Sequence, residues 1–254
     1  LGMHQTEKKL DEYFGNQRCI VVSGNSEEQP KVADAFGEAL NEALDLLLPE
    51  GNNIIAVMGG TTMAVVAEQL TNLENNQRHN LFVPARGGIG EAVTVQANSV
   101  SARMATKASG NHRALYVPEQ LSLATYNSLL NEPSIQEVLN LISQANCVIH
   151  SIGRALHMAA RRKMTEKELV MLKQANAVAE SFGYFFNENG EVVYKVPRIG
   201  IELKDLANVP IILAIAGGKS KAKAIRAYMK NAPKQTWLIT DEAAANEILK
   251  GVTL

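Results

Sequence analysis

Short apolar runs alternate with amphipathic stretches along most of this chain. Runs rich in Val and Ile are typical of buried strands, and they occur at CIVVSG (19–24), NIIAVMGG (53–60), NLFVPARGG (80–88), RALYVP (113–118), ANCVIHSIG (145–153), VPIILAIAGG (209–218) and TWLIT (236–240). Stretches with the apolar spacing of helices follow most of these runs, as at 32–48. The alternation predicts an α/β fold built on a doubly wound, mostly parallel, Rossmann-like sheet.

Two segments depart from this alternation. GYFFNENGEVVYKV (183–196) predicts a β-hairpin with Asn189-Gly190 at the turn, and with the segment around 118–134 it is expected to form an insertion or cap. Residues 1–18 carry apolar side chains at helical spacing just before the first strand and are expected to be the remnant of a linker helix. Residues 19–254 are then expected to form one domain.

Composition narrows the functional class. The 254 residues are 46% hydrophobic and 20% charged with a net charge of −1, which indicates a globular protein without a nucleic-acid-binding excess of cations. No apolar run approaches the roughly 18 residues of a membrane span, so no membrane partner is expected. Two cysteines begin apolar runs and are expected to be buried reduced thiols in a cytoplasmic protein. The five histidines lack metal-ligand spacing, and neither a metal site nor a cofactor is expected.

The first candidate site follows the strand-like run 53–60. Parallel sheets bind ligands beyond the carboxyl ends of their strands, where Gly60, Thr61, Thr62 and Met63 begin a helix. Backbone N–H groups and hydroxyl groups at such a position suit a phosphate. The alternative is a tight strand–helix turn in which a threonine is the N-cap residue.

A second group of candidates follows the run 80–88. Arg86 stands at the strand end before Gly87, Gly88 and Gly90, and arginine binds phosphates and carboxylates in a bidentate manner. Gln96, a few residues further on, could reach a sugar hydroxyl group. The alternative is a solitary surface arginine, which the adjacent glycines make less favourable because they permit close approach to a ligand.

A third group follows the run 145–153. This run is followed by a basic stretch that either clamps an anion or forms a solvated helix face, and it contains Arg154, Arg161, Arg162 and Lys163. Glu180 is an isolated acid in an apolar stretch and needs a partner. It could accept hydrogen bonds from sugar hydroxyl groups or pair with a structural arginine, and both readings stay open.

The fourth group contradicts the usual charge preference of helix starts. Three other predicted helix starts carry capping or acidic residues, as the helix dipole favours: Ser134 with Glu137, Thr165 with Glu168, and Asp241 with Glu242. After Gly217 and Gly218, however, the predicted helix opens with Lys219, Lys221 and Lys223. A bound anion held by the Gly217–Gly218 turn and Lys221 would explain these lysines, whereas the alternative is a solvated lysine run.

Two Gly-Gly turns at strand ends predict one small ligand with more than one phosphate group. ATP is not expected, because the spacing of a nucleotide P-loop is missing. The alternative function is a sugar-phosphate isomerase or deaminase. It is disfavoured because His150 lies within a strand, where histidines are mostly core residues, and no acid–base pair is evident. No catalytic residue is therefore assigned.

Taken together, these segments resemble the effector-binding domain of SorC/DeoR-type sugar-responsive bacterial transcription regulators. The resemblance covers nearly the whole chain and rests on the ordered set MGGTTMAVVAEQL, FVPARGGIGEAVTVQANSVSARMA, ANCVIHSIG, GYFFNENGEVV, AIAGGKSKAKAIRAYMK and WLITDEAAANEIL. It implies a fold similar to that of glucosamine-phosphate deaminases and ribose-phosphate isomerases. It also implies a regulator rather than an enzyme.

The resemblance further implies a phosphorylated sugar as effector, and for the most similar family member it implies fructose-1,6-bisphosphate and the repression of glycolytic genes. One phosphate would be held by the turn from Gly60 to Met63 with Arg86, and the other by Lys221 and the Gly217–Gly218 turn with Arg161 or Arg162 nearby. Gln96 and Glu180 would contact sugar hydroxyl groups. A homo-oligomer, a dimer or tetramer, is implied, and operator DNA would be contacted through an upstream helix-turn-helix domain that this chain does not include.

Overall fold

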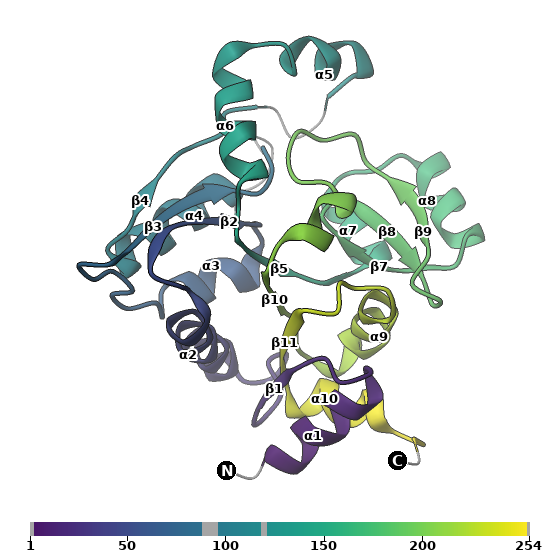
Figure 1. Ribbon diagram of the computed structural model, residues 1–254. Helices are drawn as coiled ribbons and strands as arrows, with labels where there is room; N and C mark the ends of the chain where they lie inside the picture. Colours follow the sequence, from purple (N-terminus) through teal and green to yellow (C-terminus); the bar gives the residue numbers. More distant parts are fainter. Residues whose placement is uncertain (1–2, 88–95, 118–120, 253–254) are drawn as a thin grey trace. The chain divides into compact units, whose positions relative to one another are not determined.

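The computed structural model describes residues 3–87, 96–117 and 121–252 (Figure 1). Two compact units make up the chain: unit 1 comprises Leu1–Val32, Ile152–Val196 and Ala214–Leu254, and unit 2 comprises Ala33–Ser151 and Pro197–Leu213. Each unit is described separately below, and the domain boundary at residue 19 stays a prediction.

The strands of the structure are β1 (Cys19–Val22), β2 (Gly51–Val57), β3 (Arg78–Pro84), β4 (Asn111–His112), β5 (Cys147–Ser151), β6 (Gly153–Arg154), β7 (Ala177–Ser181), β8 (Tyr184–Asn187), β9 (Val192–Lys195), β10 (Ile211–Ile215) and β11 (Thr236–Asp241). The helices are α1 (His4–Tyr13), α2 (Pro30–Leu47), α3 (Thr61–Ala67), α4 (Ala97–Ala108), α5 (Leu123–Leu129), α6 (Pro133–Ser143), α7 (Ala155–Arg161), α8 (Glu166–Gln174), α9 (Ala222–Lys230) and α10 (Glu242–Leu249), with 3₁₀ turns η2 (Leu203–Asn208) and η3 (Lys219–Lys221).

A seven-stranded sheet has the order β1-β11-β10-β5-β2-β3-β4. The pairings of β1 with β11, β2 with β5, β2 with β3 and β3 with β4 are parallel. The predicted α/β fold with a mostly parallel sheet is therefore confirmed. The strand order reverses between β5 and β2, and open α/β sheets bind ligands beyond the strand ends at such a reversal.

Residues 113–117 of the run RALYVP do not form the predicted strand, because a side chain takes both backbone hydrogen bonds of Leu115; Pro118 lies outside the described residues. The strand β4 covers only Asn111–His112 beside β3. The Asn98 side chain then accepts a hydrogen bond from the Leu115 N–H (2.9 Å) and donates one to the Leu115 carbonyl (2.8 Å). Leu115 itself is buried, so its apolar side chain serves the core without a strand.

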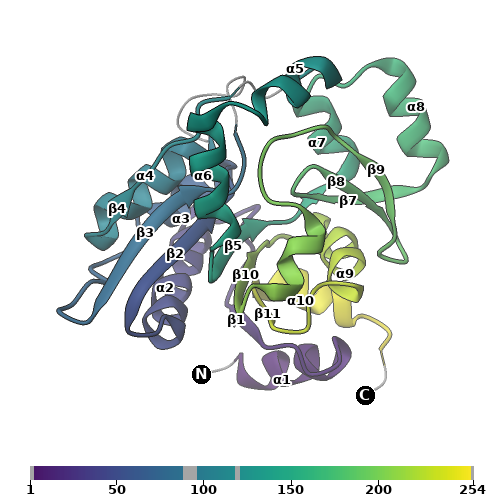
Figure 2. The same cartoon turned by 45° about the horizontal axis from the view of Figure 1, so that its top comes forward.

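The core of unit 2 is built on its central strands. Ile55 on β2, Phe82 on β3 and Ile149 on β5 are fully buried, as expected for parallel strands covered on both faces. Figure 2 shows α3 and α4 on one face of β2 and β3 and α6 on the other. Residues 118–120 lie outside the described residues, so the predicted cap is described only from 121 onward, where α5 and α6 follow.

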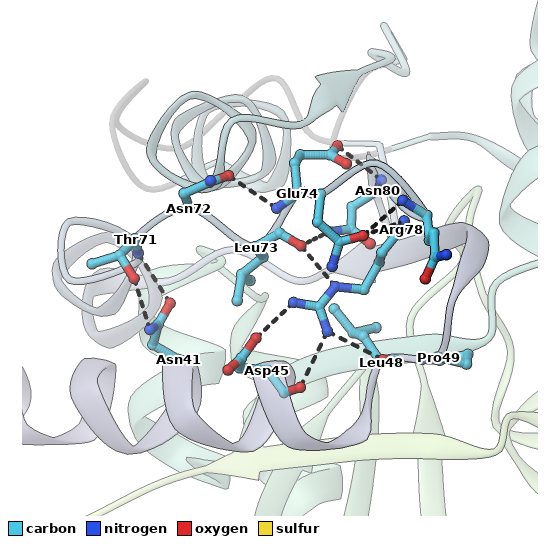
Figure 3. A network of polar contacts seen from close by, with 12 residues as sticks. Asn41, Asp45, Leu48, Pro49, Thr71, Asn72, Leu73, Glu74, Arg78 and Asn80 are labelled. Atoms are coloured by element: carbon cyan, nitrogen blue, oxygen red, sulfur yellow. Dashed lines mark hydrogen bonds and ion pairs between the residues drawn. The ribbon is translucent and has the colours of Figure 1, made fainter.

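A polar network secures the end of α2 opposite the ligand-side strand ends (Figure 3). The Arg78 side chain donates hydrogen bonds to the carbonyl oxygens of Leu73 (2.7 Å), Asp45 (3.1 Å) and Leu48 (3.3 Å) and contacts the Asp45 carboxylate at 2.6 Å. The last carbonyl groups of a helix have no hydrogen-bond donor within the helix, and here the Arg78 guanidinium is the donor. Its buried guanidinium joins α2 to the start of β3.

His150 is a core residue, as its position in a strand predicted. The side chain on β5 is fully buried, and its Nδ1 lies 3.0 Å from the Ser151 carbonyl oxygen. Burial disfavours the charged imidazolium and lowers the pKa of His150 to about 4.

We expect His150 to make the protein acid-sensitive. Between about pH 6.5 and pH 4 the unfolded chain binds a proton that the folded chain does not, so the free energy of unfolding falls as the pH drops, by about 2 kcal/mol at pH 5. Urea unfolding at pH 7 and pH 5 measures this. In a His150→Gln variant, whatever its stability at pH 7, the fall in the free energy of unfolding from pH 7 to pH 5 should be smaller by about 2 kcal/mol. Equal acid sensitivity of both proteins would contradict the prediction.

A second sheet belongs to unit 1 and contains the predicted hairpin. Its order is β6-β7-β8-β9, all antiparallel, and β8 and β9 flank the turn that contains Gly190 (φ 78°). Phe185 is buried against residues of α7 and α8, whereas the next residue, Phe186, packs edge-on against Tyr228 of α9 at 5.3 Å between ring centroids. Successive strand residues face opposite ways, so the two phenylalanines bind helices to both faces of this sheet.

The helix predicted near the N-terminus is present as α1. Its Glu7 carboxylate accepts the Val21 N–H (2.8 Å), and its Asp11 carboxylate accepts the Cys19 N–H (2.6 Å). Both amide groups belong to β1, the first strand of the sheet order, so α1 satisfies backbone donors at a sheet edge. Its role as a linker remnant stays a prediction.

Two of the three predicted helix starts are confirmed. Thr165 and Glu168 form a reciprocal capping box at α8, and the Asp241 carboxylate accepts the Ala244 N–H (2.9 Å) at α10. The pairing of Ser134 with Glu137 is wrong. The helix α6 begins at Pro133 after Glu132, because proline fits the first helical position, and Glu137 instead contacts Arg113 at 2.9 Å.

Candidate functional site

The turn after β2 in unit 2 is built by a glycine. Gly60 has φ 128° and ψ 163° and is itself the N-cap residue of α3, so the alternative with a threonine N-cap is wrong. A β-carbon added at Gly60 would contact the Ser151 hydroxyl oxygen at 3.7 Å. The amide groups of Thr61, Thr62 and Met63 begin the helix and have no acceptor within it. This turn can therefore present N–H groups to an anion.

The side chains at this turn differ in what they can offer. Thr61 is exposed and Thr62 is half-buried, so their hydroxyl groups can reach a ligand. Met63 is fully buried and belongs to the core, so only its backbone N–H can contribute. Sequence reasoning missed Ser151, a half-buried hydroxyl group at the end of β5 beside the Gly60 turn. Its position follows from the strand order, which reverses between β5 and β2 and which the sequence does not show.

Arg86 is a buried residue rather than a solitary surface arginine. It is 7% exposed and forms an isolated antiparallel bridge with Gly200. The adjacent backbone hydrogen bonds, Gly87 N–H to Ile199 (2.9 Å) and Ile201 N–H to Ala85 (2.7 Å), hold this segment in place. Unit 2 thus places a buried guanidinium beyond the end of β3, whereas Gly88 and Gly90 lie outside the described residues.

Gln96 lies at the beginning of α4. Its carbonyl accepts the Val100 N–H (2.9 Å), and its side chain makes no capping hydrogen bond. The residue is half-buried. Its predicted contact with a sugar hydroxyl group stays a prediction.

Unit 1 gathers three cationic side chains and a histidine. Arg154, His157 and Arg161 are spaced three and four residues apart along α7 and its N-cap, which places them on one helix face. Burial and then Arg154 lower the pKa of Lys221, and Arg161 adds to this effect. Partial burial and the neighbouring cations of Arg154, Arg161 and Lys221 likewise lower the pKa of His157. We call Arg154, His157, Arg161 and Lys221 the cation cluster.

The crowding of positive charge has a direct consequence for ligands. Arg154 and Arg161 make the charged forms of Lys221 and His157 less favourable, because like charges repel. An anion bound among them relieves this repulsion. Arg154 was predicted as part of the basic stretch but was not assigned to the site, and His157 was not predicted. Their spacing with Arg161 on one helix was the signal that could have assigned both.

At the Gly217–Gly218 turn, two backbone N–H groups already donate to acids of the chain itself, and the predicted binding of an anion there stays a prediction. The Gly218 N–H donates to both carboxylate oxygens of Asp241 (3.0 and 2.9 Å), and the Ser220 N–H donates to the Glu27 carboxylate (2.7 Å). The carboxylates of Asp241 and Glu27 therefore supply negative charge at the turn that precedes the lysines.

The three lysines after this turn have different surroundings. The predicted α-helix begins later than expected: Lys219–Lys221 form the 3₁₀ turn η3, Lys221 is the N-cap residue of α9, and Lys223 lies in the first turn of that helix. Lys219 is exposed, Lys223 pairs with Glu188, and Lys221 is half-buried beside the cation cluster. Lys221 is thus the lysine of this segment that lies near other cationic side chains.

Arg162 and Glu180 form a buried ion pair in unit 1. The guanidinium Nη2 lies 2.5 Å from the Glu180 carboxylate, and both side chains are 5% exposed. Glu180 also accepts the Gly183 N–H (3.0 Å). The structure favours pairing with an arginine over contact with a sugar hydroxyl group as the role of Glu180. Of the two adjacent arginines, Arg162 forms this pair and Arg161 belongs to the cation cluster.

Further chemistry is not indicated. Within residues 3–87, 96–117 and 121–252, no group of three or more His, Cys, Asp or Glu side chains is arranged to hold a metal ion. Across these same ranges, every helix is too short or too polar to cross a bilayer. Cys19 and Cys147 are buried free thiols, and burial raises the pKa of both.

Comparison with known proteins identifies the family. The family model Sugar-bind, described as a sugar-binding domain, matches residues 1–250. Over 250 residues the chain is 47% identical to the central glycolytic genes regulator of Bacillus subtilis, covering 98% of this chain and 73% of that protein. A protein of the same name from Priestia megaterium is 46% identical, with coverages of 98% and 72%.

Solved structures agree with this assignment. The crystal structure of a SorC family transcriptional regulator from Enterococcus faecalis is 74% identical with a TM-score of 0.93, covering 97% of this chain and 100% of that chain. The full-length sorbitol operon regulator SorC of Klebsiella pneumoniae shares the fold at 20% identity and a TM-score of 0.85, covering 96% of this chain and 80% of that chain. These relatives are named regulators, so the isomerase or deaminase alternative is not favoured. The chain belongs to the sugar-binding domain family of SorC/DeoR-type transcriptional regulators.

Proposed function

We propose that this chain is the effector-binding domain of a bacterial repressor of glycolytic genes and that its effector is fructose-1,6-bisphosphate. The observation that carries the proposal is the cation cluster of unit 1, in which Arg154 and Arg161 lie near enough to Lys221 and His157 to lower the pKa of both. Phosphate groups are the anions that match several clustered cations. The name of the Bacillus subtilis relative supports the choice of glycolytic genes.

A ligand with two phosphate groups is preferred, because the chain contains two separate groups of candidate phosphate-binding residues. One group is the Gly60–Met63 turn with Arg86, and the other is Lys221 with Arg161. Thr62, Ser151 and Gln96 supply polar groups suited to hydroxyl oxygens. We assign no catalytic residue, since effector binding needs only recognition.

The regulatory consequence follows from linkage. An effector shifts an equilibrium between two states only by its different affinity for them, so sugar-bisphosphate binding would change subunit packing and release operator DNA. We propose that the protein acts as a homo-oligomer, a dimer or tetramer, because operators are read symmetrically. Operator DNA would be contacted by a DNA-binding segment outside the residues of this chain.

Calorimetric titration tests the effector. Fructose-1,6-bisphosphate should bind at least about tenfold more tightly than fructose 6-phosphate or fructose 1-phosphate, since a hydrogen-bonded charged contact contributes roughly 1.5–3 kcal/mol. Glucose 6-phosphate serves as a hexose monophosphate control. Equal affinity for the bisphosphate and the monophosphates, or no binding of any of them, would contradict the proposal.

A further inference from the structure

The loop between β1 and α2 places a carboxylate on the Gly217–Gly218 turn. Glu27 accepts the Ser220 N–H at 2.7 Å, and a β-carbon added at Gly218 (φ 98°) would overlap the Glu27 carboxylate. Only glycine leaves room at this position and adopts this backbone conformation readily. The Glu27 carboxylate therefore occupies the space directly over the turn.

The same carboxylate acts on the cation cluster. Among the charged groups that affect Lys221, Glu27 raises its pKa, whereas Arg154 and Arg161 lower it. An effect in this direction means that the Glu27 charge stabilises the Lys221 ammonium group. Glu27 thus stands where the proposed effector phosphate needs to interact with Lys221.

Two acids contact this turn, and they differ in how they are held. Asp241 is fully buried and accepts N–H groups from Gly218, Ser26 (2.7 Å) and Ala244. The Asp241 carboxylate thus connects three chain segments, and its displacement would break the hydrogen bonds to all three. Glu27 is exposed and reaches the turn from a surface loop, so its displacement requires only a side-chain rotation.

We propose that Glu27 is an internal counter-ion of the effector site, which occupies the position of one effector phosphate and is displaced when the sugar phosphate binds. This inference rests on the proposed function, because it concerns the same site. It assigns to Glu27 control of effector affinity: the ligand phosphate must replace the carboxylate at the Ser220 N–H and beside Lys221. Displacement also frees the loop that leads into α2, whose first residue is Pro30.

Neutralising Glu27 tests the competition. In Glu27→Gln the side chain keeps its size and loses its charge, so fructose-1,6-bisphosphate should bind about fivefold or more tightly than it binds the unmodified protein, within the range typical of coupled sites. Glu28→Gln is the matched control, because Glu28 is the adjacent exposed acid of the same loop. Its effect on affinity should stay within about twofold, since separated surface charges are screened. Calorimetry gives all three affinities, and thermal unfolding verifies that the variants are folded.

The outcomes separate this inference from the proposed function. If fructose-1,6-bisphosphate binds the unmodified protein and Glu27→Gln with equal affinity, Glu27 does not compete, and the effector assignment stands alone. If Glu27→Gln binds more weakly, Glu27 contributes to binding, and the inference is overturned. If no sugar phosphate binds the unmodified protein or the variants, the proposed function fails, and the inference fails with it.

Discussion

Replacing Lys221 with alanine is expected to weaken binding of fructose-1,6-bisphosphate by roughly 10- to 100-fold, the range of a lost hydrogen bond to a charged group. Lys221 is half-buried beside Arg154 and Arg161, where low solvent exposure strengthens its interaction with a phosphate. Binding of a monophosphate should weaken much less, because such a ligand can use the Gly60–Met63 turn and Arg86 instead. Calorimetric titration of both ligands measures the difference.

Lys219→Ala is the control for this prediction. Lys219 lies two residues away in the same 3₁₀ turn, is exposed, and carries the same charge. Its replacement should change the affinity no more than about twofold, because an exposed charge is screened by solvent and salt. Similar losses for the bisphosphate and the monophosphate in Lys221→Ala would mean that Lys221 does not hold a distinct second phosphate.

Replacing Arg162 with methionine is expected to destabilise the protein by about 3–5 kcal/mol, the usual cost of removing one partner from a buried ion pair. Glu180 would keep the Gly183 N–H but lose the guanidinium that neutralises its charge in the interior. Urea or thermal unfolding measures the loss. The double variant Arg162→Met, Glu180→Met should recover a large part of it, because no isolated charge is then buried.

The exposed pair Arg113–Glu137 provides the matched control. Its atoms lie 2.9 Å apart, but the side chains are 44% and 64% exposed. Arg113→Met should cost no more than about 1 kcal/mol, as for surface ion pairs in general. Equal losses from both arginine variants would show that burial of the Arg162–Glu180 pair does not decide its energy.

The two roles considered for Glu180 are separated by its own variant. Glu180→Gln removes the charge and keeps a hydrogen-bonding side chain of similar size. A structural role predicts lower stability with little change in affinity for fructose-1,6-bisphosphate once the protein is folded. A large loss of affinity in a stably folded variant would instead support contact with a sugar hydroxyl group.

The elements of the fold were largely predictable because their signals are local. Apolar runs such as 53–60 and 209–218 contain β2 and β10, and the Thr165–Glu168 pair marks the start of α8. RALYVP failed as a strand because the Asn98 side chain, distant in the sequence, bonds to Leu115. Ser134 failed as a cap because Pro133 occupies the first helical position.

The candidate site was predictable to a different extent in each unit. The glycine at position 60 and the arginine at position 86 lie at strand ends, and topology alone places strand ends on the ligand side. Ser151 was missed because its proximity to Gly60 depends on β5 lying next to β2. Arg154 was predicted only as part of a basic stretch, and His157 was missed, because the proximity of both to Lys221 arises in the tertiary structure.

By itself, the sequence determined the α/β alternation, the Gly-Gly turns at strand ends and the lysines that follow Gly218. These features depend on residue type and spacing over a few positions, and local backbone preferences act over that range. Only the tertiary structure decided which charges meet: Asp241 and Glu27 occupy the amide groups of the Gly218 turn, and Arg162 rather than a ligand neutralises Glu180. Glu27 and Ser220 are 193 positions apart, and the packing of distant segments, which no local pattern encodes, brings them together.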